Sequence, residues 1–187
     1  INEFSYSIGA NLFDSKTKLR HITQNSGGLL SEKYYQGKII GEIWGYTTDG
    51  YYTVDDFENL GTDLTGGTLK PGVVAIEGKN PNPGDTKFKD LDGDGIITDG
   101  NNTVSDPGDR SVIGNNSRRF QMGFNGSVAY KGFDLSFFIQ GVLKRDIYLN
   151  HPVAFPYTFE FTTVYDHQLD YWTPTNTDAY FPRNYPN

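Results

Sequence analysis

Three aspartates at alternate positions, Asp90, Asp92 and Asp94, are the residues of this chain best suited to chemistry. Their carboxylates repel one another when they lie close together, and a bound cation relieves that repulsion. Gly95 follows directly, at the place where a calcium-binding loop turns sharply, and Ile96 can offer its carbonyl oxygen as a further ligand. The pattern is typical of the first half of an EF-hand-type loop and indicates a site for calcium or, alternatively, magnesium.

The second half of this loop pattern is incomplete. Its twelfth position, where a bidentate acid closes the coordination sphere, is Asn101. Three nearby acids could close the loop instead, namely Asp99, Asp106 and Asp109. The alternative is an acidic turn whose aspartates face water, since Asp-Gly pairs are also common turn formers. No strong amphipathic helix flanks the loop, so the pattern favours a structural cation over a calcium sensor.

The composition favours an all-β fold. Aromatic residues make up 15% of the 187 residues and there are 22 glycines, whereas methionine occurs once, a balance that favours strands and turns over packed helices. The formal net charge of −7 gives no electrostatic support for a nucleic-acid partner. The absence of cysteine excludes disulfides and thiolate metal sites. Without an initiator Met, a signal peptide or a long apolar run, we expect a fragment of a longer protein.

Alternating residues predict long, two-faced strands. One covers residues 2–13. Another covers residues 119–130 and is joined by the tight Lys131-Gly132 turn to a strand that begins at Phe133. A two-residue turn predicts six cross-strand pairs of apolar residues or glycine on one side, with mainly polar pairs on the other. The six pairs are Tyr130–Phe133, Val128–Leu135, Gly126–Phe137, Phe124–Ile139, Met122–Gly141 and Phe120–Leu143.

The strands of this hairpin have the length of membrane-spanning strands. Each covers about eleven residues, and a tilted strand needs roughly 9–11 to cross a bilayer, about twice the ordinary strand length. Four aromatic residues at or just beyond the strand ends are typical of interfacial girdles, namely Phe120, Tyr130, Phe133 and Tyr148. We therefore expect antiparallel strands and long loops that form part of a transmembrane β-barrel. A soluble sandwich, whose apolar face meets a second sheet, is the alternative.

The remaining segments predict loops and short turns. We expect a turn at Asp49-Gly50 and a short helical turn capped by Thr53. The three histidines lie at no informative spacing from a serine or a carboxylate pair, so we predict no enzyme. Several aromatic residues in loop-like segments could contact sugar rings, although packing within the loops is the better-supported alternative. They are Trp44, Tyr46, Tyr51, Tyr52, Trp172 and Tyr180.

Four blocks of the chain resemble the SusC/RagA-like, TonB-linked outer-membrane transporters. The blocks are GEIWGYTTDG at 41–50, PGDTKFKDLDGDG at 83–95, DRSVIGN at 109–115 and YKGFDLSFFIQG at 130–141, with a weaker match in LDYWTP at 169–174. The resemblance implies that residues 1–187 are part of a multi-pass β-barrel in the outer membrane of a Gram-negative cell. It places an extracellular loop region at about 54–118, with the aspartate loop inside it.

The same resemblance implies TonB-dependent import of oligosaccharide or peptide, a SusD-like surface lipoprotein as partner, and a plug and TonB-contacting segment outside these residues. In the family an Asp-Arg pair closes the aspartate loop soon after its turn. Here Asp109-Arg110 begins eight residues beyond the twelfth loop position, and we choose Asp109 as the closing ligand on this basis. The predicted metal ligands are thus Asp90, Asp92, Asp94, Ile96 and Asp109. The alternative function is a soluble calcium-stabilised β module that binds carbohydrate at the cell surface.

Overall fold

The computed structural model describes residues 4–151, 153–154 and 164–185, and its regular elements are strands apart from two short 3-10 helices. The all-β prediction is confirmed. In the described ranges, no helix has the length and apolar character to cross a membrane. The elements are β1 (Phe4–Phe13), β2 (Glu42–Tyr46), β3 (Thr48–Tyr51), η1 (Val54–Asp56), β4 (Phe57–Glu58), β5 (Thr68–Leu69), β6 (Thr86–Phe88), β7 (Arg110–Asn115), β8 (Arg119–Tyr130), β9 (Phe133–Lys144) and η2 (Asp166–Leu169).

The chain divides into two compact units, each assembled from separate stretches of sequence. Unit 1 comprises Ile1–Ser26, Tyr34–Ile43 and Gly114–Ile147, and unit 2 comprises Gly27–Lys33, Trp44–Ile113 and Tyr148–Asn187. The long strands β1, β8 and β9 belong to unit 1. The aspartate loop and the short strands β3 to β6 belong to unit 2.

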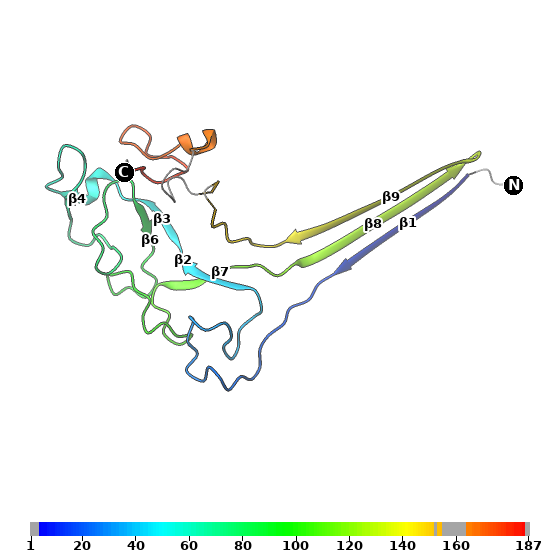
Figure 1. Ribbon diagram of the computed structural model, residues 1–187, viewed down its shortest axis with the longest axis horizontal. Helices are drawn as coiled ribbons and strands as arrows, with labels where there is room; N and C mark the ends of the chain where they lie inside the picture. Colours follow the sequence, from blue (N-terminus) through cyan, green and yellow to red (C-terminus); the bar gives the residue numbers. More distant parts are fainter. Residues whose placement is uncertain (1–3, 152, 155–163, 186–187) are drawn as a thin grey trace. The chain divides into compact units, whose positions relative to one another are not determined.

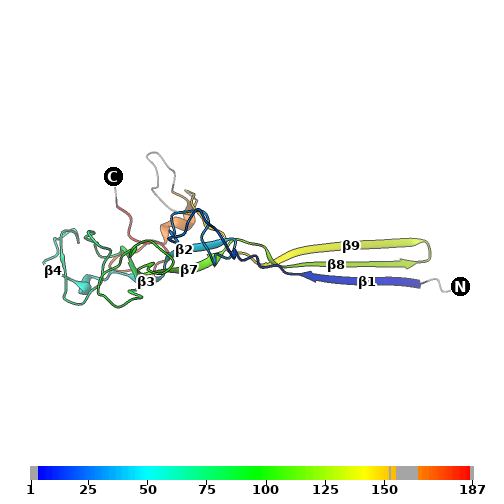
Figure 2. The ribbon, with the colours of Figure 1, turned by 90° about the horizontal axis from the view of Figure 1, so that it is seen from below.

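Unit 1 contains a three-stranded antiparallel sheet in the order β1-β8-β9, and both views of the chain show these long strands side by side (Figure 1, Figure 2). Strands β8 and β9 have 12 residues each and β1 has 10, about twice the average strand length. The predicted strand at the start of the chain is confirmed from Phe4 to Phe13. Its first two predicted residues, Asn2 and Glu3, lie outside the described residues.

The register of the hairpin agrees with the predicted one at five of the six apolar pairs, from Tyr130–Phe133 to Met122–Gly141. The sixth predicted pair, Phe120–Leu143, lies between the observed pairs Gln121–Val142 and Arg119–Lys144, which keep the predicted register. Phe120 itself has a left-handed backbone with φ of 53° and forms no ladder pair with Leu143. Lys131 and Gly132 have φ of 49° and 85°, as a type I′ turn requires at both central residues.

Strand β1 extends the apolar face across the sheet. It pairs with β8 from Phe4–Tyr130 to Phe13–Gln121, so that Tyr6 and Ile8 lie opposite Val128 and Gly126. The apolar side chains of this face remain exposed, with Phe133 at 82%, Leu135 at 67% and Ile139 at 53%. The other face carries mainly polar pairs such as Ser7–Ser127. The sheet therefore presents one broad apolar face and one mainly polar face.

Unit 2 has short strands, long connections and a small core. Within unit 2, strand β3 pairs with β6 and β4 pairs with β5; the boundary between the two units falls within β2 and β7, which pair with each other. The predicted turn at Asp49-Gly50 is wrong, because both residues lie within β3 at an irregularity in its register with β6. The predicted capped turn is confirmed in η1, where the Thr53 N–H donates to the Asp56 carboxylate at 2.7 Å. The core side chains of unit 2 are Tyr52, Phe57, Ile97, Trp172, Ala179 and Phe181.

The last described segment, 164–185, packs onto the rest of unit 2 through Arg183. The Arg183 guanidinium donates to the main-chain oxygens of Leu64 at 2.9 Å and Asp63 at 2.7 Å. The main-chain N–H of Arg183 donates to the Gly84 carbonyl at 2.9 Å. Beside Gly84, the Trp172 side chain is almost fully buried. Contacts between residues far apart in the sequence thus hold unit 2 together.

Candidate metal centre in the acidic loop

The aspartate loop is folded by hydrogen bonds from its own main chain. The Asp90 carboxylate accepts hydrogen bonds from the N–H groups of Gly93 at 2.6 Å and Gly95 at 2.9 Å. The N–H of Gly95 is the main reason that the pKa of Asp90 lies below its ordinary value, followed among the lowering contacts by that of Gly93. Gly95 has φ of 91°, which confirms the sharp turn predicted there.

Asp109 is the buried anchor of the site, with none of its surface exposed. One carboxylate oxygen accepts the N–H of Leu91 at 2.7 Å, and the other accepts the N–H of Thr98 at 2.8 Å. The Asp109 N–H in turn donates to the Thr98 carbonyl at 3.0 Å. Asp109 therefore joins the beginning and the end of the loop, and each of its oxygens keeps a lone pair for a further ligand.

Asp90, Asp92 and Asp109 form a three-carboxylate cluster. One carboxylate oxygen from each residue lies within 4.8 Å of those of the other two. Two oxygens bound to one calcium at 2.3–2.6 Å can be at most about 5.2 Å apart, so one ion could contact all three carboxylates. At Asp92 the N–H of Asp94 lowers the pKa, but burial and repulsion from Asp94, Asp109 and Asp90 outweigh it and raise the pKa overall. A cation held between the three carboxylates would relieve this repulsion.

The other two predicted ligands, Asp94 and Ile96, lie outside this three-carboxylate cluster. Asp94 is not among the three clustered acids, and its carboxylate accepts the N–H of Ile96 at 2.9 Å in a local turn. The Ile96 side chain is exposed. The five-ligand set therefore stays a prediction, of which the structure brings three members together.

The alternative closing acids are engaged elsewhere. Asp99 accepts a hydrogen bond from the Tyr46 hydroxyl at 2.5 Å and forms an ion pair with Arg110 at 3.1 Å. Asp106 accepts a hydrogen bond from the Asn101 side chain at 2.5 Å. Of the three closing candidates, Asp109 alone lies with Asp90 and Asp92.

The side chains of Arg110 and Tyr46 form hydrogen bonds to the segment between residues 98 and 109. Sequence reasoning did not predict this role for either residue. The Arg110 guanidinium donates to the Asp99 carbonyl at 3.2 Å and to the Asn102 side chain at 2.7 Å. Burial, followed by the hydrogen bond to Asp99, raises the pKa of Tyr46 to about 12. The sequence signal was the Asp-Arg pair at 109–110, because Asp99, the hydrogen-bond partner of Tyr46, lies 53 positions away along the chain.

Two of the aromatic side chains considered as sugar contacts are part of the core. Trp172 is 1% exposed and Tyr52 is 3% exposed, so neither offers a free ring face. Tyr51 donates its hydroxyl to the Tyr180 carbonyl at 2.7 Å. Tyr180 itself is 79% exposed. Packing within unit 2 explains most of this set.

Fold and site together define an antiparallel β protein that has long strands with an exposed apolar face in one unit and an acidic cluster in a second, loop-rich unit. No protein-family model matches the chain. The chain is 31% identical over 163 residues to TonB-dependent receptor P3 of Formosa agariphila, a match that covers 87% of this chain. The match covers 14% of the length of that receptor. The chain is thus similar to a short part of a much longer TonB-dependent receptor.

Proposed function

We propose that this chain is part of the β-barrel of a TonB-dependent importer in the outer membrane of a Gram-negative cell. The observation that carries the proposal is the sheet β1-β8-β9, whose strands have membrane-spanning length and whose apolar face is exposed along them. Lipid would cover that face, and the mainly polar face would point into the barrel. The similarity to a TonB-dependent receptor over most of the chain supports the same conclusion.

Within this proposal, the chain belongs to the SusC/RagA type of importer and takes part in the uptake of oligosaccharide or peptide. The sequence blocks at 41–50, 83–95, 109–115 and 130–141 support the subtype. Its partners would be a SusD-like surface lipoprotein and TonB, the latter through parts of the longer protein. Transport itself is the role of the barrel, and no enzymatic step is proposed.

The acidic loop is proposed as a structural calcium site on the extracellular side. Three clustered carboxylates support it, together with the main-chain hydrogen bonds that hold them in place. Extracellular calcium reaches millimolar concentrations, which suffices for weak extracellular sites with Kd of about 10⁻⁴–10⁻³ M. A bound ion would stiffen the loop on the side from which cargo and the lipoprotein approach.

The membrane arrangement can be tested with two neighbouring positions on opposite faces of β9. In the full-length protein, reconstituted in lipid vesicles, Leu135→Cys and Ser136→Cys are each labelled with an environment-sensitive fluorophore. Any native cysteine elsewhere in the protein is first replaced by serine. We expect brominated lipid to quench the probe at Leu135 and aqueous iodide to quench the probe at Ser136, since the two side chains point to opposite faces.

Equal quenching of both probes by iodide would show that the apolar face does not contact lipid. A full-length protein that stays in solution without detergent would lead to the same conclusion and would favour the soluble carbohydrate-binding module. The neighbouring positions make each variant the control of the other.

A further inference from the structure

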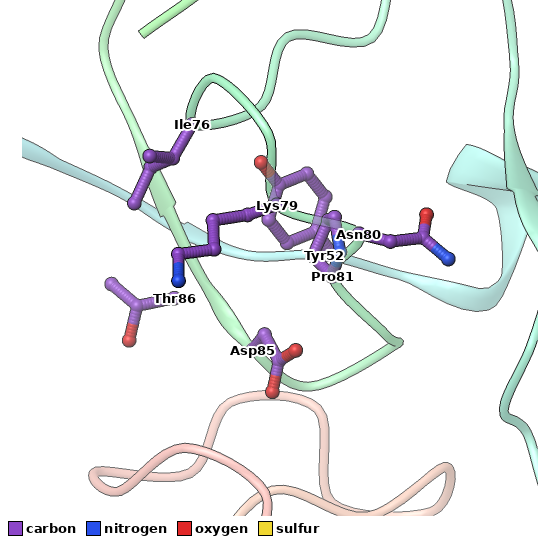
Figure 3. Close-up of a pocket in the computed structure, with 7 residues that line it drawn as sticks. All are labelled: Tyr52, Ile76, Lys79, Asn80, Pro81, Asp85 and Thr86. Carbon is purple, nitrogen blue, oxygen red and sulfur yellow. The ribbon is translucent and has the colours of Figure 1, made fainter. Parts of the chain in front are cut away.

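A pocket in unit 2 is separate from the acidic cluster but does not identify a ligand. It has a volume of about 300 Å³, and its lining includes Tyr52, Lys79 and Asp85 (Figure 3). Lys79 would attract an anion and Asp85 a cation, so the lining selects neither sign of charge. Tyr52 is almost fully buried and offers no free ring face. No class of ligand follows from this pocket.

Basic residues are concentrated in unit 1. The whole chain has a formal net charge of −7, yet unit 1 contains nine Lys and Arg residues against five Asp and Glu residues. One of the nine is Lys131, in the turn between β8 and β9. The other eight lie at or beyond the opposite end of the sheet, which we call the open end. The open end is therefore basic in a chain that is acidic as a whole.

Hydrogen bonds hold four segments of the open end side by side. Residues 17–19 and 38–40 exchange two main-chain hydrogen bonds of 2.9 Å. Residues 115–117 donate three hydrogen bonds to the carbonyls of Ile40 and Gly41, at 2.7–3.1 Å. The N–H of Asp146, just after β9, donates to the Asn115 carbonyl at 2.9 Å. Basic residues that are far apart in the sequence thus share one surface of unit 1.

The acids of the open end are engaged by other donors. Asp14 forms an ion pair with Arg119 at 2.5 Å. The Asp146 carboxylate accepts a main-chain N–H at 2.7 Å, and the Glu42 carboxylate accepts another at 3.0 Å. In the part of the chain that the structure describes, none of these three acids forms an ion pair with the remaining basic residues of the open end.

Five basic side chains of the open end are exposed and form no ion pair with a described residue. They are Lys16, Lys18, Arg20, Arg118 and Lys144, and we call them the basic cluster. Like charges on one surface repel one another, and an anion that binds among them relieves this repulsion. Phosphate suits both residue types, since Lys binds it as a point charge and Arg through two parallel N–H groups.

The basic cluster begins where the long strands end. The 12 residues of β9, at about 3.3 Å each, extend about 40 Å, and a strand tilt of about 40° makes this about 30 Å across a membrane. That distance is about the thickness of the hydrocarbon core. Lys144 is the last residue of β9, and Arg118 directly precedes β8. Both residues therefore lie at the level of the lipid headgroups if the apolar face meets lipid.

The segment from β1 onward changes from apolar to basic at alternate positions. Exposed apolar side chains occupy even positions from Phe4 to Leu12, and Lys16, Lys18 and Arg20 continue the even positions. No residue of the described segment 4–20 has a positive φ, and Lys18 forms a β-bridge with Ile39. Alternate residues of an extended chain share one side. The pattern is that of a segment that passes from hydrocarbon into a charged headgroup layer.

We propose that the basic cluster binds the phosphate groups of anionic lipid headgroups in the leaflet at the open end of the sheet. Long Lys and Arg side chains can reach from the strand ends into that layer while their stems stay on apolar surface. The inference rests on the proposed function, because the cluster meets headgroups only where the sheet contacts a membrane. Continuity with the exposed apolar face favours lipid over an acidic protein as the occupant.

The test measures lipid binding to the full-length protein in detergent by native mass spectrometry. The probe is lipid A with two phosphate groups, and phosphatidylcholine, which has no net charge, is the comparison. Two double variants each remove two positive charges of the cluster, one with Lys16→Gln and Lys18→Gln, the other with Arg118→Gln and Lys144→Gln. Each should weaken the binding of lipid A about thirtyfold, as the loss of two basic side chains near a membrane surface predicts.

The matched control removes two exposed lysines of unit 2, with Lys79→Gln and Lys89→Gln. It has the same change in net charge and should leave the binding of lipid A unchanged, because charges away from the site are screened. Millimolar inorganic phosphate should not displace the lipid, since free phosphate lacks the acyl chains that contact apolar surface.

Four results would overturn the inference. Lipid A binding that neither cluster variant weakens would leave the cluster for an acidic protein partner. Equal weakening in the control would show a general effect of charge, equally tight binding of phosphatidylcholine would show that anionic headgroups are not selected, and displacement by inorganic phosphate would show a site for the free ion.

The lipid site and the barrel proposal can fail separately. If the face-specific quenching of β9 is observed and lipid A binding does not depend on the cluster, the lipid site is wrong and the barrel proposal stands. If binding depends on the cluster and the quenching is absent, the cluster binds headgroups on a protein whose sheet does not cross the bilayer.

Discussion

Asp92 and Asp109 contribute to the acidic cluster from opposite environments. Asp92 is exposed, and its carboxylate accepts the N–H of Asp94 at 3.2 Å. Asp109 is buried and accepts two main-chain N–H groups at the two ends of the loop. The first residue is thus suited mainly to bind a cation, whereas the second also folds the loop.

This difference leads to a prediction for the full-length protein in detergent. Calcium should raise the melting temperature, and Asp92→Ala should abolish that rise while changing the melting temperature in chelator little. Asp109→Asn should lower stability even in chelator, by about 1–3 kcal/mol, because its amide group leaves a buried N–H of Leu91 or Thr98 without an acceptor. Thermal unfolding by calorimetry distinguishes the three proteins. Equal melting curves of the natural protein with calcium and with chelator would contradict the metal site.

Gly84 illustrates a position that only one residue type can occupy. Its backbone has φ of 92°, and an added Cβ would lie closer than van der Waals contact to Trp172 and 2.6 Å from the Cβ of Arg183. Trp172 and Arg183 both come from the end of the described chain, so Gly84 permits this segment to pack.

We expect Gly84→Ala to destabilise unit 2 by roughly 3 kcal/mol through backbone strain and steric overlap. Gly72→Ala is the control, since Gly72 has φ of 86° with open space around its Cβ position, and it should cost only about 1–2 kcal/mol. Native-state hydrogen exchange measures both effects at two main-chain amides. The Arg183 amide donates to the Gly84 carbonyl, and the Tyr52 amide donates to the carbonyl of the neighbouring Asp85. Equal exchange in the two variants would show that close packing at Gly84 is unimportant.

At the scale of elements, the hairpin β8-β9 shows how far a pattern of alternating residues specifies structure. Alternation fixed the faces, and the two-residue turn fixed the register, so five apolar pairs agree with the prediction. The register continues to Arg119–Lys144, but the left-handed backbone of Phe120 within it is a local feature that alternation does not reveal. The irregularity lies at the end of the hairpin away from the turn.

The two faces of β9 predict opposite responses to a charge. Ile139→Arg, near the middle of the strand on the apolar face, should destabilise the barrel by about 2–4 kcal/mol if that position lies near the bilayer midplane. Gln140→Arg, on the polar face, should have little effect. Urea unfolding of the full-length protein in lipid vesicles provides the comparison. A similar loss of stability in both variants would argue against a lipid-facing side chain at Ile139.

At the scale of the whole molecule, the chain forms two units that differ in how they are stabilised. Unit 1 relies on long ladders of main-chain hydrogen bonds, whereas unit 2 relies on a small core and on many hydrogen bonds between loops. The predicted cation belongs entirely to unit 2.

Calcium should therefore act locally. We expect it to slow hydrogen exchange in residues 90–109 of the full-length protein and to leave exchange in β8 and β9 unchanged, since no predicted ligand comes from these strands. Hydrogen-exchange mass spectrometry with calcium and with chelator measures both regions in one experiment. Protection that rises equally in β8 and β9 would show that the ion acts on the chain as a whole.

The sequence by itself determined the features that depend on local pattern: the all-β class, the faces of the long strands, the turn at Lys131-Gly132 and the acidic loop. Strand alternation and turn chemistry act over a few residues, so they can be seen in the sequence. The tertiary structure decided which distant segments meet. It paired β1 with β8, placed an Arg119–Asp14 ion pair at the end of that pairing, and brought Tyr46 to Asp99.

For the acidic site too, the sequence predicted some features and the tertiary structure determined the others. The alternating aspartates were visible in the sequence, and Asp109 was chosen there by resemblance to a family, but its burial and its two main-chain partners depend on the path of the intervening residues. The pocket beside Tyr52 had no sequence signal, because its lining comes from three separated stretches. Contacts of this kind depend on how long loops close and pack, and that is a property of the folded chain and not of local residue pattern.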